Sequence, residues 1–450
     1  MEASPMLAAA DLYPLVVDWL RAVFAVAPPP SAAQNALAHL VTAVLLSQRL
    51  RPSALMRALL SPAPLPARQR YKRVARAWTR PWLSPAALTP HLVRAVLAVV
   101  RPDADGVTHL ALDSVRCGRW EVLTLGVVWR GRALVVGWAV LPYPWPRGRF
   151  TPTVCALVRQ VGAAWPAARP VHLVADRGFP SQRLFAVVRA VGWGWTLRLR
   201  ARTAVAVDGR VRSVRALLDP ARRAGWSAQP AAYGAGPRAL AGTLVVGQGL
   251  PVVPWHQRGP ASRAARARQQ TERQRYLLRK HRAERGHSDS SCETDAWVVL
   301  FTSHPTWLTA VRSYGRRWAI EGSYRDAQGG WDGRHGWDLE RALARLTDAT
   351  TVERVVGLWA LGALLQTQVG AHVTGAAPPA VRQAVGEWTT TGRMSVWARG
   401  QFALTDPSGR LADWLRQTLR CAASTVAPAG GSGRGRHRPT FVQLPLLEAA

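Results

Sequence analysis

Residues 109–114 read HLALDS and residues 171–179 read VHLVADRGF, and in both segments an aspartate directly follows a run of apolar residues. Each run has the length and composition of a short, buried β-strand. We therefore expect Asp113 and Asp176 at strand ends, where an acidic side chain can be solvated and can face a ligand. If the two strands are neighbours, the carboxylates lie side by side, and their mutual repulsion calls for a cation between them.

The sequence around these two segments predicts a mixed sheet covered by helices. Three β-rich runs at 107–113, 120–129 and 132–141 are separated by short turns containing Gly118 and Gly131, which favours an antiparallel meander. The next expected elements are a helix, a strand, a helix and a strand, at 151–168, 171–176, 181–191 and 194–200. The order β-β-β-α-β-α-β is typical of an α/β fold with a mixed sheet.

The rest of the chain differs in composition from this region. Apolar residues recur at helical spacing within 1–104. A hairpin is expected around Asp208, which precedes a glycine, and it opens a β-rich insertion whose later part, 258–285, is strongly basic. The final expected elements are a strand, a long helix and an apolar helix, at 297–303, about 309–328 and 351–368.

The net charge points to a polyanionic partner. The 450 residues include 59 Lys and Arg against 26 Asp and Glu, a formal net charge of +33. A GC-rich codon bias can explain arginine in place of lysine, but it does not explain a twofold excess of cations over anions. Nucleic acid is the usual partner of so basic a chain. The basic stretch from Arg68 to Arg80, which contains Tyr71 and Trp78, is either a helix that lies on DNA or a solvated basic helix.

Cysteine usage and apolar runs exclude other classes of protein. Cys117, Cys155, Cys292 and Cys421 form no CxxC pair, so a disulfide framework or a zinc site is not expected. The first residues lack the basic region of a signal peptide. The longest apolar run, 355–365, is too short to span a bilayer, so we expect no membrane segment.

A third carboxylate lies in the segment SYGRRWAIEGSYRDAQ, residues 313–328. Relative to Tyr314, the residues Arg317, Glu321 and Gln328 follow at offsets of 3, 7 and 14. At 3.6 residues per turn, these positions line one face of a helix. This stripe would present a phenol, a guanidinium and a carboxylate toward one surface.

Each of these acids also has a purely structural interpretation. An aspartate at a strand end often caps a turn, and Asp176 is compatible with that role alone. Arg317 and Glu321 are also spaced as an ordinary ion pair within a helix, shared with Arg325, which contributes only a few tenths of a kcal/mol. That alternative gives no reason for Tyr314 on the same stripe.

Taken together, these motifs resemble the DDE transposases of the insertion-sequence-four family. The family signature has the form Y-x2-R-x3-E-x6-K, and the corresponding residues here are Tyr314, Arg317, Glu321 and Gln328. LALDS and LVADRGF resemble its first and second aspartate motifs, and WVVLFTSHP, which begins at Trp297, resembles the strand before the signature helix. The resemblance covers about residues 105–370.

The resemblance implies a ribonuclease-H-like catalytic core, a mixed sheet flanked by helices and interrupted by a β-rich insertion, with a helical N-terminal domain. We predict an N-terminal DNA-binding region, the first part of the core, the insertion with its basic arm, the second part of the core, and a C-terminal region with a flexible tail. Their expected bounds are 1–104, 105–202, 203–295, 296–375 and 376–450.

The implied function is an endonuclease that cuts double-stranded DNA at the inverted-repeat ends of an insertion sequence and joins the freed 3′-OH to target DNA. Two divalent ions, Mg²⁺ or Mn²⁺, would be held by the catalytic residues Asp113, Asp176 and Glu321. Residues predicted to contact DNA are Tyr314, Arg317, Arg325, Gln328 and Trp297. Trp297 either stacks on a flipped base or belongs to the core. We expect a homodimer in the synaptic complex, at the nucleoid in a prokaryotic cytoplasm.

Other functions remain compatible with the same residues. A metal-dependent nuclease on the same core would cut without joining. A catalytically impaired or domesticated relative would only bind DNA, and Gln328 favours this weakly, because an amide can hydrogen-bond a phosphate but does not neutralise it. A basic packaging protein would need neither a chain that is 48% hydrophobic nor acids at two strand ends.

Overall fold

The structure is a computed structural model that describes residues 9–59, 66–218, 225–234, 236, 239–248, 297–328, 336–375, 396–405 and 412–426. The predicted basic arm at 258–285, the predicted flexible tail from 427 and Cys292 lie outside the described residues.

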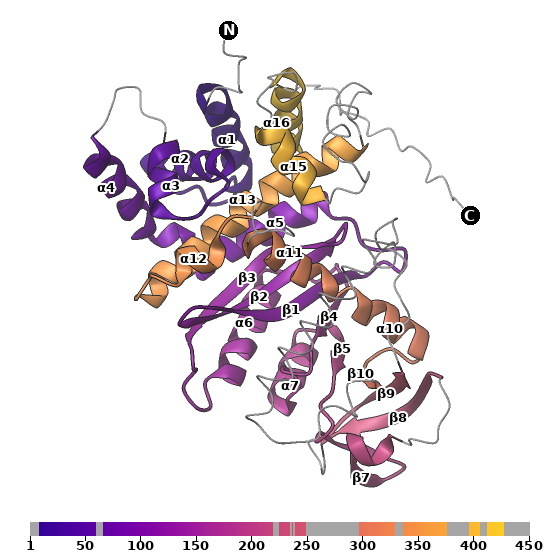
Figure 1. Cartoon of the computed structure of the whole chain (residues 1–450). Helices are drawn as coiled ribbons and strands as arrows, with labels where there is room; N and C mark the ends of the chain where they lie inside the picture. The colour runs from indigo at the N-terminus through magenta and orange to yellow at the C-terminus, as the bar shows by residue number, and fades with distance from the viewer. Residues whose placement is uncertain are drawn as a thin grey trace, which may run out of the picture.

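Within the described residues, a ten-stranded mixed sheet has the order β3-β2-β1-β4-β5-β10-β9-β8-β6-β7 (Figure 1). Strands β1, β4 and β5 run parallel to one another, and the other pairings are antiparallel. The strands are β1 (Thr108–Cys117), β2 (Trp120–Trp129), β3 (Arg132–Pro142), β4 (Val171–Ala175), β5 (Gly194–Arg198), β6 (Ala204–Val207), β7 (Arg210–Ser213), β8 (Ser227–Tyr233), β9 (Leu240–Gln248) and β10 (Trp297–Thr302).

The predicted order β-β-β-α-β-α-β is confirmed from β1 to β5, with α6 (Phe150–Ala164) and α7 (Gln182–Ala190) as the two helices. The predicted hairpin around Asp208 is also confirmed as β6–β7. Asp208 and Gly209 have φ angles of 51° and 74°, as a two-residue turn matching the twist of the strands requires. The described strands of the insertion extend the same sheet, because β9 pairs with β10.

The helical N-terminal region is confirmed. Its elements are α1 (Ala9–Val23), α2 (Ser31–Ser47), α3 (Pro52–Ala58), α4 (Ala67–Trp78), the 3₁₀ turn η1 (Pro81–Leu83) and α5 (Pro85–Val99). A second short turn, η2 (Val214–Leu217), follows β7, and α12 (Leu339–Leu343) precedes the long apolar helix α13 (Ala349–Gly375). No helix in the described part of the chain is both long and apolar enough to span a bilayer.

The described C-terminal helices pack against the N-terminal ones. Helix α16 (Ala412–Val426) contacts α1 and α5, and α15 (Val396–Thr405) contacts α13 and α2 (Figure 1). Trp19 of α1 donates a hydrogen bond from Nε1 to the side chain of Gln368 in α13 at 2.9 Å. The two ends of the described chain therefore share one helical layer.

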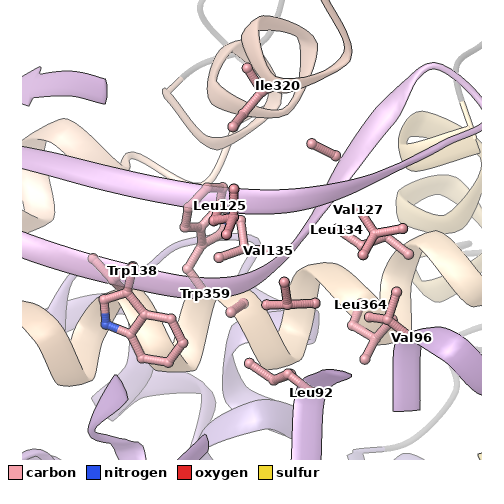
Figure 2. Packing of buried hydrophobic residues seen from close by; sticks show 14 of the residues in the cluster. Leu92, Val96, Leu125, Val127, Leu134, Val135, Trp138, Ile320, Trp359 and Leu364 are labelled. Atoms are coloured by element: carbon pink, nitrogen blue, oxygen red, sulfur yellow. The ribbon is translucent and has the colours of Figure 1, made fainter. Parts of the chain in front are cut away.

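The meander β1–β3 is packed on both faces. Figure 2 shows Leu125 and Val135 of the sheet between Ile320 on one side and Leu92 on the other. Ile320 belongs to α11 (Trp318–Gln328), and Leu92 belongs to α5, which contacts both β3 and α13. Burying each such side chain contributes about 1.5–3 kcal/mol, so the strand that carries Asp113 lies in a rigid frame.

The predicted single helix at about 309–328 is wrong. The structure has α10 (Trp307–Gly315) and α11, separated by a turn at Arg316 and Arg317. In this turn Arg317 N donates to Tyr314 O at 3.0 Å, a three-residue spacing tighter than that of an α-helix. Glycine at 315 is a poor helix former and stands where the first helix ends. Helical periodicity cannot reveal such a break, because the residues on both sides keep helical spacing.

Candidate active site

Strand register places the two aspartates next to each other. The parallel pairs of β1 and β4 run from Thr108 with Val171 to Leu112 with Ala175. Asp113 directly follows Leu112, and Asp176 directly follows Ala175. The expectation that Asp113 ends its strand is wrong, since β1 continues to Cys117. Beyond Leu112, however, β1 pairs only with β2, so Asp113 lies where β4 has left the sheet.

One buried arginine lies among the three predicted acids. Nη1 of Arg317 is 2.7 Å from Oε1 of Glu321 and 3.5 Å from Oδ2 of Asp113. The hydroxyl of Tyr314 donates to Oδ1 of Asp176 at 3.0 Å. The break between α10 and α11 therefore does not disperse the predicted residues. The end of one helix and the first turn of the next bring them to the two strands.

The two aspartates experience different electrostatic environments. Burial raises the pKa of Asp113 to about 6, and the charges of Glu321 and Asp176 add to the shift while Arg317 opposes it. Burial also acts against ionisation of Asp176, but Arg317, the backbone N–H of Arg177 and the Tyr314 hydroxyl together lower its pKa. Burial, more than the charges of the neighbouring carboxylates, therefore disfavours ionisation of Asp113.

Arg317 is the counter-charge of the cluster. Its side chain is only 6% exposed. Burial alone would lower its pKa, but Tyr314, Glu321 and the two aspartates raise it. The guanidinium carbon lies 4.8 Å from the ring centre of Trp318, a cation–π contact. The Nε atom is buried and has no hydrogen-bond partner, so this cation retains an unused donor.

An open pocket of about 460 Å³ adjoins the cluster, lined by Asp113, Ser114, Val115, Glu321, Tyr324, Arg325 and Gln328. Glu321, Arg325 and Gln328 are spaced along one face of α11 and point into it. The opposite face is bonded to β3, because Ser323 Oγ accepts from Ala133 N at 2.9 Å and Asp326 pairs with Arg132. The predicted contacts Arg325 and Gln328 therefore share one pocket with two of the three acids.

Trp297 does not line the pocket beside the acids. It begins β10, is half-buried and packs against the main hydrophobic core. Two other aromatic residues, Trp318 beside Arg317 and Tyr324 in the pocket wall, lie nearer the acids and were not predicted. Their positions within the signature segment were the only available signal.

The chemistry of the donors fits a divalent cation, since carboxylate oxygens are the ligands that Mg²⁺ and Mn²⁺ take. As placed, no three His, Cys, Asp or Glu side chains among the described residues are grouped so that they could hold a metal ion. Arg317 lies between Asp113 and Glu321 and already supplies positive charge there. The chemistry of the donors therefore suits a divalent cation, while in this structure the guanidinium of Arg317 supplies the positive charge between Asp113 and Glu321.

Residues 151–337 match the family model described as Transposase DDE domain. The match supports a DDE transposase. It includes Asp176, which follows β4, and Glu321 in α11, and it begins after Asp113. No curated protein matches the chain. Acids from distant segments of the chain approach Arg317 and Tyr314 here, at the ends of β4 and α10 and on β1 and α11.

Proposed function

We propose that the protein is a DNA transposase of the insertion-sequence-four branch, with a ribonuclease-H-like core, which cuts the ends of a mobile element and joins the freed 3′-OH to target DNA. The main support is that Asp113 and Glu321 pair with Arg317 while the nearby Tyr314 bonds to Asp176, beside an open pocket. The transposase domain match over 151–337 adds independent support.

In this proposal Asp113, Asp176 and Glu321 would hold two divalent ions, Mg²⁺ or Mn²⁺. When bound, the ions supply Lewis-acid stabilisation of charge on the phosphate oxygens. The side chains must be ionised to act as ligands. Since the pKa of Asp113 is about 6, its carboxyl is mostly ionised at neutral pH even without metal.

Arg317 would bind the phosphate at the cut. A guanidinium presents a planar fork of donors that suits a phosphate, and the Nε atom of Arg317 has a donor without a partner. Tyr314 orients Asp176 through its hydroxyl. Arg325 and Gln328, on the pocket side of α11, would contact the neighbouring backbone, with Arg325 supplying the charge that Gln328 lacks.

The duplex would also contact the N-terminal helices. Val74, Ala77 and Trp78 of α4 are buried, while Arg68, Lys72, Arg73 and Arg76 are exposed together with Tyr71. One face of α4 thus anchors the helix and the other presents positive charge to phosphates. Because two element ends must be held together, we propose a homodimer in the synaptic complex, acting at the nucleoid in a prokaryotic cytoplasm.

The test uses the DNA that flanks the gene. Short inverted repeats outside the coding region would define the element ends, and duplexes that carry them are incubated with the protein and Mg²⁺. We expect a cut that frees a 3′-OH, followed by joining to a plasmid target. Cutting without joining of pre-cut ends would favour a nuclease, and binding without cutting would favour an impaired relative.

A further inference from the structure

Tyr324 connects the helix that carries Glu321 to the strand that carries Asp113. Its side chain is buried, and its hydroxyl donates to the backbone oxygen of Asp113 at 3.1 Å. The same hydroxyl oxygen lies 2.5 Å from Oγ1 of Thr124. Tyr324 follows Glu321 by three residues, so the two side chains project from neighbouring positions on α11.

Each hydroxyl proton in this contact can be assigned to a hydrogen bond. Thr124 can donate its hydroxyl proton to the Tyr324 oxygen, and Tyr324 then donates its own proton to the carbonyl of Asp113. Each hydroxyl therefore has a distinct role, and the chain ends on the backbone of a catalytic acid.

The hydrogen bond from Tyr324 lies at the same level of the sheet as Asp113. Thr124 of β2 is the residue registered opposite Asp113 of β1, and β4 has ended just before this level, at Ala175. Two further attachments of α11, through Ser323 and Asp326, go to β3. These bonds hold the helix on the sheet, whereas the Tyr324 hydroxyl bonds to Asp113 itself.

From these contacts we propose that Tyr324 is a positioning residue, which fixes the spacing between the carboxylates of Asp113 and Glu321. The inference rests on the proposed function, because that spacing matters for a shared metal site. Its ring packs near Trp359 of α13, with ring centres 6.2 Å apart, so loss of the hydroxyl alone should leave the helix in place. The positioning role is therefore assigned to the hydroxyl group of Tyr324.

The test compares Tyr324→Phe with wild-type protein, using the full chain. Mn²⁺ affinity is measured by titration calorimetry without DNA, and kcat and KM are measured for cleavage of an element-end duplex. We expect Mn²⁺ affinity to fall by about 10-fold or more, as for other residues that orient metal ligands. We also expect kcat to fall with KM for DNA unchanged, and the far-ultraviolet circular dichroism to stay the same.

Two further variants separate positioning from stability. Tyr233→Phe removes a phenol hydroxyl on β8, where the ring packs with Phe185 and Phe301, and should leave Mn²⁺ affinity unchanged. Thr124→Val removes the donor to Tyr324 but keeps its bond to Asp113, and should give a smaller loss than Tyr324→Phe. A Tyr324→Phe variant that only melts earlier, with normal Mn²⁺ affinity and kcat, would overturn the inference. Wild-type protein that neither binds Mn²⁺ nor cuts would instead overturn the proposed function.

Discussion

The two ends of the parallel pair β1–β4 make an instructive comparison. At one end His109 and His172 are in register, with ring centres 5.5 Å apart. At the other end Asp113 and Asp176 follow the last registered pair. Helix α10 contacts both ends through consecutive residues, because Ser313 bonds to His109 and Tyr314 bonds to Asp176. Register therefore brings titratable side chains together at either end.

At the histidine end, the histidines form hydrogen bonds with neighbouring side chains. Nδ1 of His109 is 2.9 Å from Asp103 and Nε2 of His172 is 2.8 Å from Thr196. The ring of His304 stacks on His172 at 4.1 Å and bonds to Ser313 at 2.9 Å. Burial lowers the pKa of both His172 and His304, so these rings are neutral near pH 7.

The acid end retains charge and opens to a pocket. Two carboxylates pair with one guanidinium, a third is bonded by Tyr314, the pKa of Asp113 is raised to about 6, and a pocket of about 460 Å³ adjoins them. A register pair alone is therefore a weak sign of function. Uncompensated charge beside an accessible pocket is the stronger sign.

The largest expected difference between the two ends is in catalysis. Asp113→Asn should reduce cleavage at least about 1000-fold, because metal stabilisation worth several kcal/mol is lost and each 1.36 kcal/mol is tenfold in rate. DNA affinity, measured by fluorescence anisotropy, should stay within about twofold of wild type, since phosphate contacts dominate it. The matched control is Asp208→Asn in the β6–β7 turn, which should cleave normally. Retained cleavage by Asp113→Asn would remove Asp113 from the site.

The histidine end should affect stability and leave catalysis intact. His172→Phe removes the hydrogen bond to Thr196, which should cost about 1–3 kcal/mol of unfolding free energy at pH 7, measured by urea denaturation. Cleavage in the folded range should remain within about twofold of wild type, a margin well below one kcal/mol. A large loss of cleavage with unchanged stability would show that the histidine end acts in the chemistry.

The same variant tests the sign of the pH dependence. His172 has a folded-state pKa well below the ordinary value of 6.5, so the unfolded chain binds more protons as the pH falls below 6.5. Wild-type stability should therefore fall with decreasing pH in that range. The deficit of His172→Phe should shrink in parallel, because the variant has lost that group. A constant deficit from pH 7 to pH 5 would contradict a neutral, buried His172.

The smallest expected effect concerns the counter-charge. Arg317 is the largest influence that lowers the pKa of Asp113, so Arg317→Gln should raise that pKa further above about 6, in the metal-free protein. The measurement is a nuclear magnetic resonance titration of the aspartate carboxyl carbons. Arg312→Gln, at an exposed position of α10, is the control and should leave the titration unchanged. An unmoved Asp113 would contradict Arg317 as the counter-charge.

Much of this arrangement could be predicted from the sequence. The apolar runs before Asp113 and Asp176 identified β1 and β4, and the spacing of Tyr314, Arg317 and Glu321 identified the third segment. These signals are local, and each depends on the polarity of side chains along one element.

The features that could not be predicted from the sequence depend on contacts between helices and strands. The break between α10 and α11 is hidden because spacing stays helical across it, and the extension of β1 to Cys117 depends on pairing with β2. The bond from Tyr324 to the backbone of Asp113 leaves no trace in sequence, since any residue supplies a carbonyl. The histidine end was missed for the same reason, because register and not composition unites His109 with His172.

The most direct test of the central claim uses Fe²⁺ in place of the native metal, with ascorbate and peroxide, to cut the polypeptide near its binding site. If Asp113, Asp176 and Glu321 form one metal site, the cuts should fall near all three residues, and excess Mg²⁺ should suppress them together. Cuts near none of these residues, or near only one of them, would contradict a shared site.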